Sequence, residues 1–159
     1  MPTEGLLDDV KVSDVVMHDV TTPLHLSVKP GNTAGRVWVD RLTATGVNLA
    51  AASLESWAET PIGRVCLRDV SLEFAGGGVI DPARTEVLAP GVDARPLPAW
   101  GLYARNVQAL QLENVRLGVV KDDARPALIA ERVGTIDLDA LKLPRGALAP
   151  VVLNDVGEV

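Results

Sequence analysis

A strand-like pattern recurs along this chain about once every 27 residues. Its copies begin at Val10, Val37, Val65, Leu110 and Ile136, giving steps of 27, 28, 45 and 26 residues. A fixed period of this length predicts a stack of similar units rather than one globular core. Because apolar and polar residues alternate within each copy, each copy is expected to be a half-buried strand. The pattern therefore predicts an all-β fold, a single-chain right-handed parallel β-helix (a solenoid).

A second series of short strands lies between these copies. It comprises residues Leu24–Val28, Ala51–Trp57, Leu102–Val107, Ala127–Val133 and Pro150–Val156. Each turn of the solenoid is thus expected to carry at least two strands, and the chain to form about five turns. The length suits a single domain covering residues 1–159.

Aspartate or asparagine followed by valine marks the expected bends of the coil. The dipeptide occurs seven times, at Asp9, Asp14, Asp19, Asp69, Asn106, Asn114 and Asp155. Asp and Asn tolerate the left-handed backbone region better than other residues with a side chain. Each dipeptide predicts a sharp bend, after which valine returns to the strand and points inward. Arg41, Arg132 and Ala140 stand at corresponding bends without the dipeptide.

The step of 45 residues is read as one period plus an inserted loop over residues 76–98. This stretch has three consecutive glycines, four prolines and no clean alternation. A long loop without periodicity is uncommon in a compact domain, so it is expected to be anchored or functional. Its apolar residues Val79, Ile80, Val87 and Leu88 are predicted to hold it against the side of the coil.

Composition narrows the class of partner. The net charge of −6 argues against nucleic acid, because a phosphate-binding surface needs excess Lys and Arg. No run of 18 apolar residues predicts a membrane-spanning helix, and the first residues do not resemble a signal peptide. The single Cys66 alternates within a strand and is interpreted as a small core residue. No cofactor is predicted.

Five segments together resemble a known family. They are Met17–Leu26, Thr60–Phe74, Leu97–Val107, Leu110–Leu117 and Asp122–Val133. In their order the chain resembles the C-terminal part of polygalacturonase-like enzymes, glycoside hydrolase family 28, in the pectin lyase-like β-helix superfamily. The resemblance implies a parallel β-helix, a link to pectin-type polysaccharide and, as in many members, a secreted or periplasmic setting.

The catalytic motifs of that family are missing from this chain. Members carry N-T-D, a D-D pair after Gly or Gln, G-H-G and R-I-K, and three of their aspartates perform the chemistry. Here Asp122-Asp123 stands in K-D-D-A-R-P, and neither His18 nor His25 is flanked by glycines. No catalytic residue is therefore assigned, and the chain resembles the turns that follow the catalytic ones.

Two carboxylate groupings have alternative interpretations. Asp14, Arg41 and Asp69 stand one period apart, which suits an ion-pair ladder along one corner. The spacing also allows the two carboxyl groups of an inverting glycosidase. The pairs at residues 8–9 and 122–123 are read as solvated turns, with cation binding as the alternative. His18 and His25 lack a third ligand nearby, so no metal site is predicted.

Tryptophan supplies the candidate carbohydrate contacts. Trp38 lies between inward-facing valines and should face outward, Trp57 ends a short strand, and Trp100 ends the inserted loop. Tryptophan rings stack on sugars, but a lone tryptophan also commonly packs a loop against a core. All three residues are kept as candidates for polysaccharide binding.

Two classes of function follow. The first is a non-catalytic β-helix module that binds polysaccharide or assembles with itself. The second is a glycosidase acting on pectin-type polysaccharide, with a site completed by another chain. Because the first turn leaves strands unpaired, a homodimer is expected, with Leu6, Leu7, Val10 and Val12 near its contact.

Overall fold

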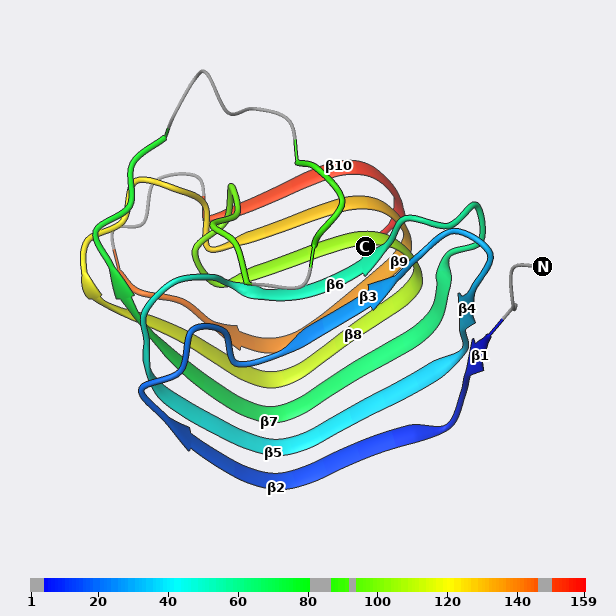
Figure 1. Ribbon diagram of the computed structural model, residues 1–159. Coiled ribbons are helices and arrows are strands. Elements are labelled where there is room, and N and C mark those ends of the chain that lie inside the picture. The colour runs from blue at the N-terminus through cyan, green and yellow to red at the C-terminus, as the bar shows by residue number, and fades with distance from the viewer. Residues whose placement is uncertain (1–4, 81–86, 92–93, 146–149) are drawn as a thin grey trace.

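The chain folds as a β-solenoid of about five turns, as the repeat predicts (Figure 1). The computed structural model describes residues 5–80, 87–91, 94–145 and 150–159. Within them the strands are β1 (Leu6–Leu7), β2 (Val10–His18), β3 (His25–Val28), β4 (Thr33–Ala34), β5 (Arg36–Val47), β6 (Ala52–Ser56), β7 (Ile62–Gly76), β8 (Leu102–Lys121), β9 (Leu128–Lys142) and β10 (Val151–Glu158). No helix occurs in these described ranges.

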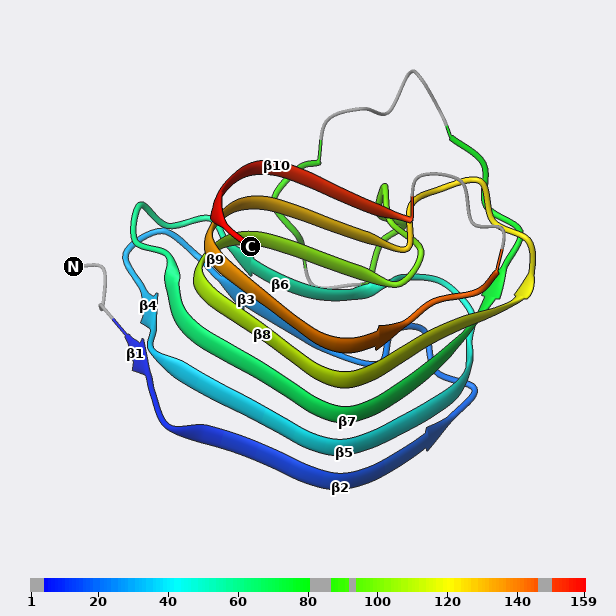
Figure 2. The same cartoon turned by 180° about the vertical axis from the view of Figure 1, so that it is seen from behind.

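All strand pairs are parallel, and apart from the short separate pair of β1 with β4 they form two stacks on opposite sides of the coil. One stack contains β2, β5, β7, and the later parts of β8 and β9. The other contains β3, β6, the first parts of β8 and β9, and β10. Figure 1 shows the first stack rising from β2, and Figure 2 shows β10 with the C-terminus at the opposite end. The long strands β8 and β9 bend to cross both stacks.

The five copies of the repeat lie directly beside one another. Val10 pairs with Val37, Val37 with Val65, Val65 with Leu110, and Leu110 with Ile136. Each inward side chain therefore packs on its equivalent in the next turn. The sequence period thus predicts the strand register as well as the strands.

The predicted bends are confirmed at every marked position. All seven Asp and Asn residues of the repeated dipeptide have positive φ angles, from 51° to 59°. Arg41, Arg132 and Ala140 also adopt this conformation, at 57°, 51° and 58°. The left-handed region lets the strand turn a corner without breaking its ladder of hydrogen bonds. These residues thus place the corners of the coil.

The core inside the coil is almost wholly aliphatic, with one aromatic pair. Phe74 and Trp100 pack edge to face, with ring centroids 5.7 Å apart. Cys66 is not a core residue, and that interpretation is wrong. It lies half-buried on the outer face of β7, beside Trp38 of β5, while Val65 and Leu67 point inward.

The inserted loop leaves β7 and returns to the coil before β8, covering the outer face of the second stack. Val87 and Leu97 pack there against Tyr103 and Ile129. The prediction that the loop folds back is confirmed, but three of the four residues predicted to anchor it do not pack on the coil. Val79, Ile80 and Leu88 are 74%, 65% and 68% exposed. Polar bonds supply the missing anchors, because the outer face beneath the loop also carries charged residues.

Candidate functional site

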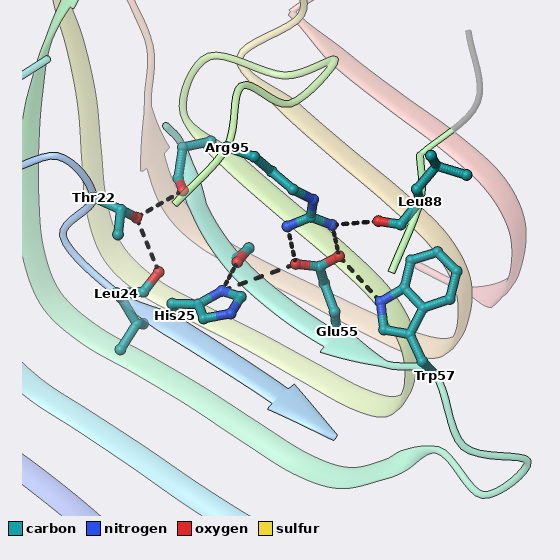
Figure 3. Close-up of polar contacts among 9 residues, drawn as sticks. Thr22, Leu24, His25, Glu55, Trp57, Leu88 and Arg95 are labelled. Carbon is teal, nitrogen blue, oxygen red and sulfur yellow. Dashed lines mark hydrogen bonds and ion pairs between the residues drawn. The ribbon is translucent and has the colours of Figure 1, made fainter. Parts of the chain in front are cut away.

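A buried carboxylate on the second stack joins the inserted loop to the coil. Glu55 in β6 lies between inward-facing Leu54 and Ser56, so its side chain points outward, yet it has no exposed surface. Arg95 of the loop binds this carboxylate through both of its terminal nitrogens. Nη2 lies 2.6 Å from Oε1 and Nη1 lies 3.1 Å from Oε2 (Figure 3). Arg95 Nη2 also donates to the carbonyl oxygen of Leu88 at 2.8 Å.

The same carboxylate orients Trp57, which follows β6 directly. The indole Nε1 donates to Glu55 Oε1 at 3.2 Å, as Figure 3 shows. The guanidinium of Arg105 lies 4.0 Å from the centre of the indole ring, in cation–π contact. The backbone nitrogen of Trp57 donates to Val28 O at 2.8 Å. One edge and one face of the ring are therefore fixed.

Histidine and small hydroxyls complete this network on the N-terminal side. His25 Nδ1 lies 2.6 Å from Ser53 Oγ and 3.9 Å from Glu55 Oε2. Thr22 Oγ1 donates to Ala51 O at 3.1 Å. The sequence places His25 on a strand but gives no sign that it neighbours a buried glutamate.

The polar row continues across the next turns. Pairing between strands places Glu55 beside Arg105, and Arg105 beside Glu131. Tyr103 donates its hydroxyl to Glu131 Oε2 at 2.8 Å, and Arg105 Nη1 lies 3.5 Å from the same oxygen. Burial, with the bond to Glu131, raises the pKa of Tyr103 well above its usual range. This phenol therefore stays protonated and serves as a structural donor.

An open groove of about 730 Å³ lies beside Trp57. Its polar lining comes from Glu59 and Thr60 after β6, and from Asn32 and Thr33 near β4; glycine, proline, alanine and leucine line the rest. Ser56 Oγ donates to the carbonyl of Thr60 at 2.8 Å, and Asn106 Nδ2 donates to that of Ala58 at 3.1 Å. Gly5 N donates to Asn32 Oδ1 at 2.9 Å. The walls are thus held before any ligand arrives.

The other two tryptophans do not share this groove. Trp38 faces outward on β5 as predicted, half-buried, with the Arg36 guanidinium 5.8 Å from the ring centre. Trp100 is 3% exposed inside the coil, so its ring cannot stack on a sugar. Trp100 is therefore no longer a candidate. Its backbone is already part of the coil, because Trp100 N donates to Pro126 O of the next turn at 2.9 Å.

The Asp14–Arg41 pair of the predicted corner ladder is confirmed, but the continuation to Asp69 is wrong. Arg41 binds Asp14 through two bonds, of 2.5 and 3.0 Å. Its other nitrogen donates at 2.9 Å to Asp40, a buried carboxylate that also accepts from Arg68 at 3.0 Å. Asp69 instead accepts from Asn114 Nδ2 at 2.8 Å. The sequence reasoning missed Asp40, although an acidic residue directly before the Arg41 bend and one period before Arg68 was a usable signal.

These bonds lower the pKa values of the carboxyl groups. A hydrogen bond from Arg41 holds the pKa of Asp14 below its ordinary value. A hydrogen bond from Arg68 does the same for Asp40. The backbone nitrogen of Arg36 does the same for Asp8. Burial opposes the effect at Asp123, but bonds from Arg125 and from Gly78 N lower its pKa nonetheless. Groups held as anions are poor general acids.

No metal site emerges from the aspartate pairs or the histidines. Asp123 is fully engaged by Arg125 and the loop, and Asp8 Oδ1 accepts from the backbone nitrogens of Asp9 and Arg36. His18 Nδ1 lies 2.8 Å from Thr45 Oγ1. Over the part of the chain that the structure describes, no three His, Cys, Asp or Glu residues gather as metal ligands.

Comparison with known proteins adds no relative. No family model, curated protein or solved structure matches this chain. Across residues 5–80, 87–91, 94–145 and 150–159, no helix is long and apolar enough to cross a membrane.

Proposed function

We propose that this chain is a non-catalytic β-helix module that binds polysaccharide in the groove beside Trp57. The observation that carries the proposal is the fixed indole: Glu55 holds its nitrogen and Arg105 covers one face. A ring held in place before binding loses little conformational freedom when a ligand arrives. Half-buried, and lining a groove whose walls are pinned, it offers a flat apolar surface for the carbon face of a sugar.

The alternative, a glycosidase acting on pectin-type polysaccharide with a site completed by another chain, has weaker support. Such chemistry needs one carboxyl group with a raised pKa and a second one able to activate water. Where the pKa of a described carboxyl group shifts, at Asp8, Asp14, Asp40 and Asp123, it shifts downward. Glu55, buried, is already paired with Arg95.

Affinity gel electrophoresis against a panel of plant polysaccharides tests the proposal. We expect retardation by at least one of them, lost in Trp57→Ala and kept in the matched variant Trp38→Ala. No reducing ends should appear above the buffer level. Binding that survives Trp57→Ala, or release of reducing ends that one Asp→Asn change abolishes, would overturn the proposed function.

We also propose that the chain self-associates through its first turn. Strand β2 pairs with β5 along one edge, and no described strand pairs with its other edge. Leu6 and Leu7 are 72% and 44% exposed, and Val10 and Val12 are only half-buried. An unpaired edge beside exposed apolar side chains favours a second copy of the strand.

The pattern within β2 supports an antiparallel, two-fold arrangement. Its residues that pack on the core are Val10, Val12, Val15 and Met17, a spacing that reads the same in both directions. An antiparallel copy would thus bring apolar residues beside apolar residues. Light scattering should show a dimer at micromolar concentration, disrupted by Val12→Lys and unchanged by the outward-facing control Ser13→Lys. A stable wild-type monomer would refute the self-association.

A further inference from the structure

We infer that the groove beside Trp57 selects uncharged sugar units over uronates, and that Glu59 sets this selectivity. The inference rests on the proposed function, because it concerns the same groove. It narrows the ligand from polysaccharide in general to one whose bound unit carries no carboxylate.

The first argument is the charge of the lining. Among the described residues that line the groove, Glu59 alone carries a charge. Proteins hold carboxylate ligands with arginine or lysine, which form strong charge-assisted bonds. Here a uronate would meet an exposed carboxylate instead, on a chain whose net charge is −6.

The second argument is that the guanidinium stacked on Trp57 is already engaged. Arg105 stacks on Trp57 at 4.0 Å and pairs with Glu131 at 3.5 Å. Its side chain is only 21% exposed, and it is not among the residues lining the groove. Lys29 precedes Pro30 in sequence but also does not line the groove. Neither cation offsets Glu59 within the lining.

The third argument is that the remaining polar groups suit hydroxyls. A carboxylate accepts hydrogen bonds from neighbouring hydroxyl groups, and Asn32, Thr33 and Thr60 can both donate and accept. Trp57 supplies the apolar face against which a pyranose ring lies. An aromatic surface bordered by a carboxylate and short polar side chains matches a ring that displays hydroxyls on its edge.

A matched pair of ligands isolates the charge. Oligogalacturonide in its fully methyl-esterified form and in its free-acid form shares one backbone, and calorimetric titration compares them on wild-type protein. We expect the ester to bind about two- to fivefold more tightly at low salt, the ratio that repulsion between exposed charges produces. Raising the salt from about 0.02 M to about 0.5 M should shrink that ratio, since ions screen surface charges.

Three variants decide between outcomes. Glu59→Gln should tighten binding of the acid about threefold and leave the ester within about twofold. Trp57→Ala should abolish binding of both, with Trp57→Phe as the conservative variant if a urea titration shows Trp57→Ala unfolded; Trp38→Ala is the control. Trp57-dependent binding that favours the acid, or a ratio unmoved by Glu59→Gln, overturns only this inference. Binding of neither form overturns this inference alone if the polysaccharide panel still shows Trp57-dependent retardation, and overturns both proposals if it does not. Binding independent of Trp57 also overturns both.

Discussion

Replacing Arg95 by methionine should release the inserted loop from the coil. Methionine keeps much of the apolar length of arginine but removes both bonds to Glu55, of 2.6 and 3.1 Å. The Glu55 side chain has no exposed surface, so it would become a buried charge without its arginine. Among the described residues, Trp57 Nε1 would still donate to it, and His25 Nδ1 would lie 3.9 Å from Oε2. Breaking such a pair from one side costs about 3–5 kcal/mol. Because Arg95 is 23% exposed, the lower end of that range applies.

The variant can avoid this cost by opening the loop, so the assay measures loop opening. If the loop lifts away, water reaches Glu55 while the coil stays folded. A fall of about 3 kcal/mol in the free energy of loop opening multiplies the open fraction by about 10². Thermolysin cleavage before Val87, which packs on Tyr103 and Ile129 while the loop is closed, should therefore accelerate about 100-fold, whereas the urea midpoint of the coil should move much less.

Three further variants make the reasoning refutable. In Glu55→Gln/Arg95→Met no charge is left buried, so most of the loss should be recovered. With the single variant Glu55→Gln added, the cycle gives the coupling between the two residues. Arg64→Met removes an exposed arginine whose side chain, among the described residues, makes one bond, of 3.5 Å to Gln111, and it should leave cleavage unchanged. Cleavage of Arg95→Met within about twofold of wild type would show that the pair does not anchor the loop.

Three other predictions concern stability and reactivity. Ala140→Gly should raise the free energy of unfolding by about 0.5–1 kcal/mol, because Ala140 has a φ of 58° that glycine adopts without strain. Ala130→Gly, within a buried strand, should lower it by about 1 kcal/mol. Urea titration measures both. The Asp123 carboxyl has a pKa below its ordinary 3.8, so the stabilisation that it gives is complete above that value and is lost as pH falls through its lower folded-state pKa. Asp123→Asn should therefore flatten the acid limb of a stability–pH curve; an unchanged acid limb would contradict this. Burial raises the pKa of the Cys66 thiol, so iodoacetamide should alkylate it more slowly at pH 8 than it does in urea; equal rates would contradict this.

The strands, their register and their bends were predictable because each is encoded locally. Alternation marks a strand within a few residues, and the period aligns Val37 with Val65 without reference to the rest of the chain. The bends carry their own chemistry, since aspartate and asparagine tolerate a positive φ. Even Arg132, which lacks that chemistry, was identified by its place in the period.

The centre of the candidate site was not predictable in this way. Glu55 and Arg95 are 40 residues apart, and Arg95 lies in a loop with no periodicity to place it. One signal was present: Glu55 is the only charged residue in the strand A-A-S-L-E-S-W, an unusual position beside a tryptophan. Pairing it with Arg95 required the path of the loop, which depends on tertiary packing.

The pairing of β7 with β8 shows that the inserted loop does not change the strand register of the coil. The sequence offset between partners is 45 at the first pair, Ile62 with Val107, and again at the last, Gly76 with Lys121. Residues added or removed between Gly78 and Arg95 change that offset but move no partner, whereas one deletion inside β7 would turn an inward face outward. The loop can therefore diverge in length and composition while the scaffold beneath it stays constant. Descendants of one coil could acquire different surfaces over the second stack, provided that an arginine still reached Glu55.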